Sequence, residues 1–188
     1  MVDHGPSPEA HGRVSDPERY SVLHDAANQL LGELDERYVV ARTDGLEVDQ
    51  EIGRMARTEA ITRLAPHAAD AAPLVIAITS FPGVIARFGR WHIEAFPRCG
   101  CDACDEDPLD LVEQVQGDVR ALVEGRFREA IVGRFRPGLT YAFAGHGPSH
   151  SGWSRLSRRQ ARDFGGPAAL SWRPWIERRR PAGFGSGS

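Results

Sequence analysis

Apolar side chains recur at three- and four-residue intervals in two long stretches of the chain. They are Tyr20, Leu23, Ala27, Leu30, Leu31 and Leu34 in the first stretch, and Val112, Val115, Val119, Leu122 and Val123 in the second. This spacing places the apolar residues of each stretch on one face of a helix. The pattern predicts a helix from a capping box at 15–18 to about Arg37, and another from Asp107 to about Glu124.

Elsewhere the pattern changes to alternation or to short apolar runs, which are typical of strands. Strands are predicted at 38–42, 59–64, 73–79, 84–88, 91–96, 127–136, 139–144 and 170–175, with a loop at 145–152 and a short arginine-rich helix at 157–164. Pro82-Gly83 and Gly89-Arg90 are the expected turns of an antiparallel sheet. Grouped strands without a βαβ repeat predict an α+β fold, in which a mainly antiparallel sheet packs with the two longer helices. The loop with the cysteines lies between a hairpin and the second helix.

The 188 residues are enough for one domain with its own core. We expect this domain at 15–177, between a disordered leader at 1–14 and a disordered Arg/Gly/Ser tail at 178–188. No apolar run approaches the ~20 residues that cross a bilayer, and the first residues lack the apolar segment of a signal peptide. A cytoplasmic location is therefore expected, where thiols stay reduced.

All 23 basic residues are arginines, so the chain has no lysine for a Schiff base, a pyridoxal phosphate anchor or a Walker A loop. Residues 1–154 hold 15 arginines against 24 acidic residues (−9), whereas residues 155–188 hold 8 against 2 (+6). Such asymmetry can indicate a nucleic-acid-binding arm, but the acidic body can bind the basic segment within the chain. We expect neither a nucleic-acid nor a membrane partner, and a protein partner stays open.

The three cysteines of the chain, Cys99, Cys101 and Cys104, lie within six residues of each other. A C-x2-C spacing forms a tight turn, and Cys99 lies two residues earlier, where an extended chain points it to the same side. The three sulfurs can therefore converge on one tetrahedral zinc ion at ~2.3 Å. Acidic neighbours attract a cation and raise thiol pKa values, which favours a metal over thiol catalysis. Redox-active thiols, an iron–sulfur cluster and buried structural cysteines are the alternatives.

A closed zinc site needs a fourth ligand, and no cysteine remains to supply it. His92 on the preceding strand is the preferred candidate, and His146, His150 and Asp105 are the others. The predicted metal ligands are thus Cys99, Cys101, Cys104 and His92.

Four segments together resemble an uncharacterised bacterial domain family of unknown function. These are the strand with Trp91-His92, the run 96–106 with its CGCDACDE stretch, the segment 149–153 and the terminal 172–175. The resemblance spans 17–180, and CGCDACDE is its most specific part. It implies that the cysteine run is a family feature, and it implies no activity.

Three functions follow as hypotheses. The first is a small domain that binds zinc in a structural or binding role. The second is a zinc enzyme with an open metal position, where His92 or Glu94 moves protons. The third is a metal-free module that binds a protein through its acidic loop or its Arg/Trp segment.

Overall fold

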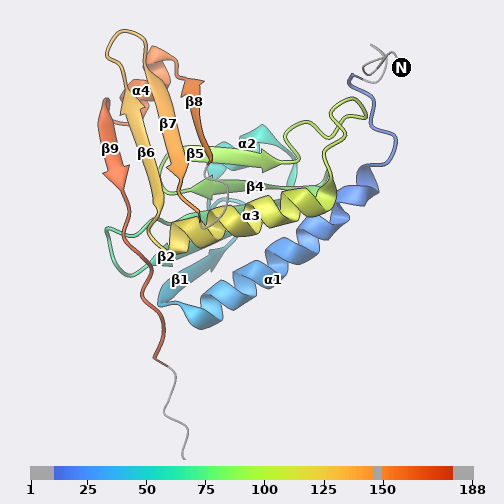
Figure 1. Cartoon of the computed structure of the whole chain (residues 1–188), viewed down its shortest axis with the longest axis horizontal. Coiled ribbons are helices and arrows are strands. Elements are labelled where there is room, and N and C mark those ends of the chain that lie inside the picture. The colour runs from blue at the N-terminus through green and yellow to red at the C-terminus, as the bar shows by residue number, and fades with distance from the viewer. Residues whose placement is uncertain (1–10, 146–149, 180–188) are drawn as a thin grey trace, which may run out of the picture.

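The computed structural model describes residues 11–145 and 150–179 (Figure 1). A 3₁₀ turn at Pro17–Ser21 comes first in these residues. The helices and strands that follow are α1 (Val22–Arg37), β1 (Val40–Asp44), α2 (Gln50–Met55), β2 (Thr58–Pro66), β3 (Leu74–Thr79), β4 (Gly83–Phe88), β5 (His92–Phe96), α3 (Pro108–Val123), β6 (Phe127–Val132), β7 (Gly138–Phe143), β8 (His150–Arg155), α4 (Arg158–Asp163) and β9 (Ala168–Ser171). Most of the predicted leader and tail, 1–10 and 180–188, lies outside the described residues. No helix in the described part is long and apolar enough to cross a membrane.

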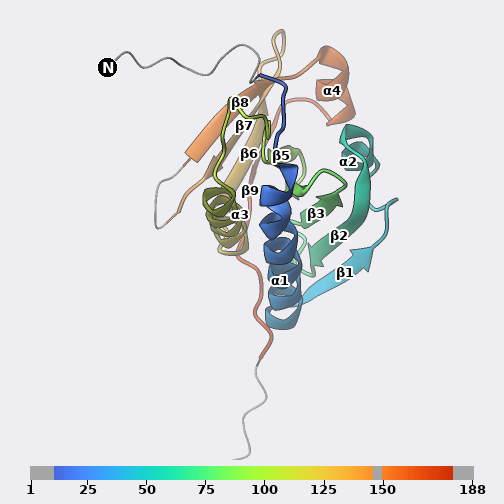
Figure 2. The ribbon, with the colours of Figure 1, turned by 90° about the vertical axis from the view of Figure 1, so that its right-hand side faces the viewer.

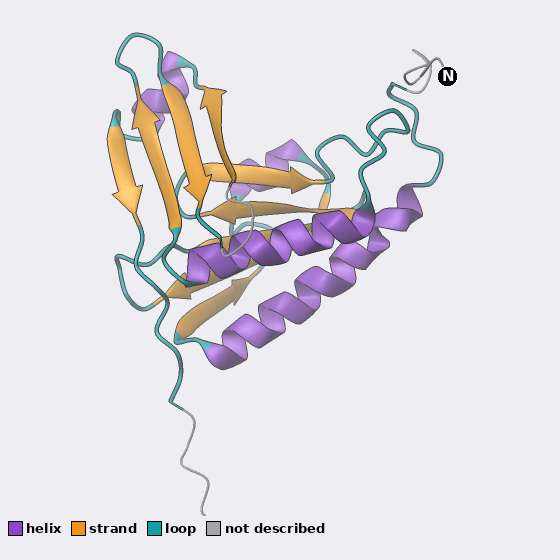
Figure 3. Cartoon of the chain, in the orientation of Figure 1, coloured by secondary structure: helices purple, strands orange, loops and turns teal. Residues whose placement is uncertain are grey.

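The strands form two antiparallel sheets (Figure 3). The first has the order β1-β2-β3-β4-β5, and the second has the order β8-β7-β6-β9. The chain passes from β5 of the first sheet through the cysteine loop into α3, and then into β6 of the second sheet. The fold is therefore α+β, as the grouping of strands predicted.

The two long helices, α1 and α3, lie side by side; α1 packs against the first sheet, and α3 contacts β7 of the second sheet (Figure 2). Their apolar faces, with Leu23 and Leu31 on α1 and Val119 and Leu122 on α3, are buried in one core with Phe88 of β4. The same core extends to the second sheet through aromatic side chains of β6 and β7. Packing of these faces, rather than helix propensity, explains why both helices form here.

The N-terminal end of the first helix differs from its prediction. The capping box at 15–18 is absent: a 3₁₀ turn precedes α1, and the Ser15 hydroxyl donates to Asp102 at 2.7 Å instead. The tertiary acceptor competes with the helix for this hydroxyl. The predicted loop at 145–152 contains the start of β8, an edge strand whose burial pattern carries little apolar signal.

Glu129 of β6 joins the two sheets. Its side chain is 2% exposed and accepts the backbone N–H groups of Arg90 (2.7 Å), Trp91 (2.9 Å) and His92 (3.1 Å) and the indole N–H of Trp172 (3.2 Å). Burial raises the pKa of this carboxyl, although the four donors oppose the shift. Glu129 thereby fixes the start of β5, the strand that leads to the cysteines.

Candidate metal centre

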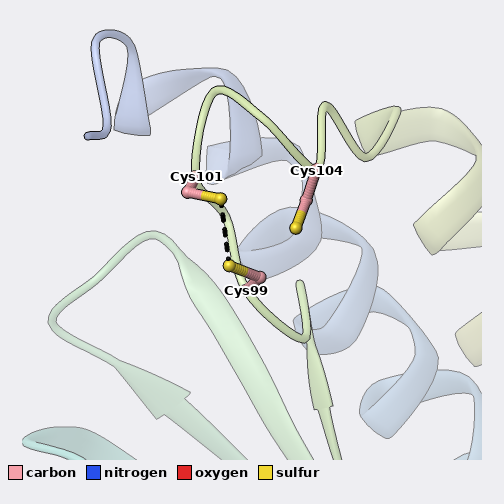
Figure 4. Close-up of side chains that lie close together, drawn as sticks. All are labelled: Cys99, Cys101 and Cys104. Atoms are coloured by element: carbon pink, nitrogen blue, oxygen red, sulfur yellow. Dashed lines mark hydrogen bonds between the residues drawn. The ribbon is translucent and has the colours of Figure 1, made fainter. Parts of the chain in front are cut away.

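The three cysteines lie in the loop between β5 and α3, and their sulfurs face one another (Figure 4). All three sulfurs are within 4.8 Å of each other, and the sulfurs of Cys99 and Cys101 are 3.2 Å apart. Two sulfurs on one tetrahedral zinc ion are about 3.8 Å apart, given zinc–sulfur bonds of ~2.3 Å. The predicted convergence of Cys99, Cys101 and Cys104 is therefore present, at a spacing that suits a single ion.

The backbone of the loop explains this convergence. The N–H groups of Cys104 and Asp105 both donate to the carbonyl of Cys101, at 3.1 and 3.2 Å, which closes the tight turn of the C-x2-C segment. Gly100 has φ +72°, and a Cβ there would lie 2.8 Å from the ring of Phe81. Only glycine fits this position without strain, and it lets the chain bend between the first two cysteines.

Two acidic side chains of the loop hold the N-terminal segment. Asp102 accepts from Arg13 (3.0 Å) and from both the backbone N–H and the hydroxyl of Ser15 (2.8 and 2.7 Å). Asp105 accepts from Arg19 at 2.8 Å. These acids connect the loop to the chain before α1, so the loop is anchored at a point distant in sequence.

The next two acids bind backbone N–H groups. The Glu106 carboxylate accepts from Arg98 (3.3 Å), Cys99 (3.1 Å) and Gly100 (3.4 Å). Asp107 caps the N-terminus of α3, as the sequence predicted. Glu106 therefore supports the backbone from which the first cysteine projects.

The thiols differ in acidity. Hydrogen bonds from the Gly12 backbone, the Cys99 thiol and the Cys104 backbone lower the pKa of Cys101 to about 6. The neighbouring sulfurs of Cys101 and Cys99 raise the pKa of Cys104 to about 12. The expectation of a raised thiol pKa from acidic neighbours is wrong for Cys101, because the hydrogen-bond donors of the loop dominate there.

The structure does not bring His92 to the sulfurs. Its imidazole is buried, stacks on Tyr141 with ring centroids 3.6 Å apart, and has Nε2 3.3 Å from Glu94 Oε2. His92 begins β5, and an extended strand advances ~3.3 Å per residue, so the strand separates it from the loop. His146 lies outside the described residues. His150 lies 3.4 Å from Asp118, and the carboxylate of Asp105, the candidate within the loop itself, contacts Arg19 at 2.8 Å.

A second group of ligand-type side chains was missed by sequence reasoning. Glu94, Asp118 and His150 have side-chain donor atoms within 4.8 Å of one another. Burial and the nearby Glu94 raise the pKa of Asp118 to about 8. No spacing motif connects three residues from separate elements. The sequence does contain one signal of a buried acidic residue. Asp118 lies three residues after Val115 and four before Leu122, which places it on the apolar face of α3.

The fold and both groups fall inside one family match, which covers residues 2–179. The chain belongs to DUF6226, a family of unknown function. Comparison with curated proteins and with solved structures gives no match. Membership of DUF6226 confirms the resemblance to an uncharacterised family, and it brings no activity or ligand with it.

Proposed function

We propose that this protein binds one zinc ion through Cys99, Cys101 and Cys104, and that this ion has a structural role. The observation that carries the proposal is the convergence of all three sulfurs of the chain within 4.8 Å. Thiolates are soft ligands, and zinc is the common ion of tetrahedral thiolate sites. A role in packing alone would not require three sulfurs to face one point.

The surroundings of the loop support a structural role. The loop touches the segment before α1 through Asp102, connects β5 to α3, and presents its backbone to Glu106. An ion that holds the three sulfurs would fix these parts relative to each other, so its binding free energy would add to folding. We assign the fourth position to water, because the Asp105 carboxylate contacts Arg19 and is not among the side chains that converge with the sulfurs.

Metal analysis tests this proposal. Untagged protein purified without chelator is expected to contain one more zinc per chain than Cys104→Ser, measured by native mass spectrometry and elemental analysis. Cys104 is exposed, so the serine variant removes a sulfur at little packing cost. The matched control is Asp102→Asn, which weakens the contacts to Arg13 and Ser15 but keeps the sulfurs, and it should keep the zinc. Equal zinc in wild type and Cys104→Ser would refute the proposal.

Glu106→Gln is expected to lower zinc affinity by about 10- to 100-fold without changing the number of ions bound. Glutamine would turn an NH₂ group toward backbone N–H groups that now meet carboxylate oxygens, and so would disturb the backbone around Cys99. Competition with a chromophoric chelator measures the change. Asp110→Asn removes the same charge from an exposed site on the first turn of α3, and it should bind as wild type does. If Glu106→Gln binds zinc with the same affinity as Asp110→Asn, a supporting role for Glu106 is excluded.

A further inference from the structure

Three side chains from three elements meet outside the cysteine loop. They are Glu94 of β5, Asp118 of α3 and His150 of β8, with one oxygen or nitrogen of each within 4.8 Å of the others. His150 Nε2 and Asp118 Oδ1 are 3.4 Å apart. Ligands bound ~2.1 Å from one ion are about 3.0–3.5 Å apart when they are adjacent in its coordination shell. The spacing of His150 and Asp118 is therefore compatible with two ligands of one ion.

Two of these donors lack a hydrogen-bond partner among the residues that the structure describes. Asp118 Oδ2 and His150 Nε2 are both buried atoms without one. The Asp118 side chain is only 4% exposed, and Glu94 is equally buried. Buried polar groups nearly always have partners, and a buried carboxylate without one is costly. Both unpaired atoms belong to the same cluster, so one group that binds both would satisfy them together.

A proton on Asp118 does not satisfy this cluster. A protonated carboxyl group becomes a donor and needs an acceptor. Asp118 Oδ2 has no hydrogen-bond partner in the described part of the chain. A proton between His150 Nε2 and Asp118 Oδ1, which are 3.4 Å apart, would pair these two atoms but leave Asp118 Oδ2 without a partner. A cation satisfies the carboxylate and the imidazole nitrogen together.

Glu94 is held in place by neighbours, as metal ligands usually are. Its Oε1 accepts from Arg98 Nε at 2.9 Å and from Gln114 at 3.4 Å, and its Oε2 faces His92 Nε2 at 3.3 Å. Arg98 offsets one of the two carboxylate charges. The remaining charge of the cluster favours a cation.

We propose that Glu94, Asp118 and His150 form a second site, which binds a divalent transition-metal ion through one nitrogen and two carboxylate groups. This donor set is chemically harder than three thiolates, and it shares no ligand with the cysteine loop. The presence of either site can therefore be tested independently of the other. Glu94 also lines a groove of about 580 Å³ together with His92, Arg98 and Tyr141. Three protein ligands leave a coordination position for water, the arrangement found in catalytic metal sites.

Cobalt distinguishes the two sites in one titration. Co²⁺ bound by thiolates gives intense near-ultraviolet charge-transfer absorption, and Co²⁺ bound by carboxylates and imidazole does not. We expect metal-free full-length protein to bind two Co²⁺ ions per chain, only one of them with the thiolate band. Cys101→Ser should lose the thiolate band and keep the other ion. Wild type with a thiolate band but only one ion would overturn the second site and leave the zinc proposal intact.

The ligand variants locate the second ion. His150→Ala, at a half-buried edge position, and the isosteric Asp118→Asn should each weaken the ion without the thiolate band by at least about tenfold and leave the band unchanged. His24→Ala is the matched control, a half-buried histidine on α1 whose ring contacts the Gly83 carbonyl. It should bind as wild type does. If both ligand variants, folded by circular dichroism, bind two ions with wild-type affinity, the assignment is overturned.

Discussion

Replacing Cys101 by serine is expected to release the loop metal and to lower the melting temperature by about 8–16 °C. A ligand present at about 1,000 times its dissociation constant adds about 4 kcal/mol to the free energy of unfolding. For a domain of this size, each kcal/mol corresponds to a shift of about 2–4 °C. Cys101 is the buried member of the cluster, so a substitute ligand or water cannot easily take its place. Calorimetry on zinc-loaded protein measures the shift.

Serine at a buried position has a cost of its own, and a chelator separates this cost from metal loss. Chelation should lower the melting temperature of wild type by most of the difference between the two proteins, and it should leave Cys101→Ser nearly unchanged. If chelation does not lower the melting temperature of wild type, or lowers that of Cys101→Ser by as much, the stability of the loop does not depend on a thiolate-bound ion.

Local pattern was enough to predict the two long helices and the central strands. Their apolar residues repeat at the period of the element, and one face of each element is buried in the core. The short helix α2 was not predicted, because its six residues carry only Ile52 into the core. The edge strand β8 was missed because most of its side chains are exposed, so no alternation marks it.

The same contrast separates the two candidate sites. Cys99, Cys101 and Cys104 are so close in sequence that a tight turn alone brings them together, and sequence could predict that. Glu94 and Asp118 meet only because β5 and α3 pack together, so their proximity is a tertiary property. His92 is close to Cys99 in sequence, but β5 extends between them, so nearness in sequence does not bring the imidazole to the sulfurs.

Glu129→Ala is expected to lower the free energy of unfolding by about 3–5 kcal/mol. The substitution leaves three backbone N–H groups and one indole N–H without their acceptor, at a residue that is 2% exposed. An unsatisfied buried donor costs about 1–3 kcal/mol, and water entering the vacated space recovers part of that cost. Denaturant unfolding measures the loss. Glu59→Ala is the matched control, an exposed glutamate on β2, and it should change stability by no more than about 0.5 kcal/mol.

The position of Glu129 makes a further readout possible. Its carboxylate holds the N–H of His92, the first residue of β5, and Glu94 lies two residues further along the same strand. In the folded fraction of Glu129→Ala, Co²⁺ should therefore bind more weakly at Glu94, Asp118 and His150. The thiolate absorption should be retained, because the cysteine sulfurs lie beyond the far end of β5. A variant within 1 kcal/mol of wild type would mean that the turn between β4 and β5 finds other acceptors, and that Glu129 does not set the position of β5.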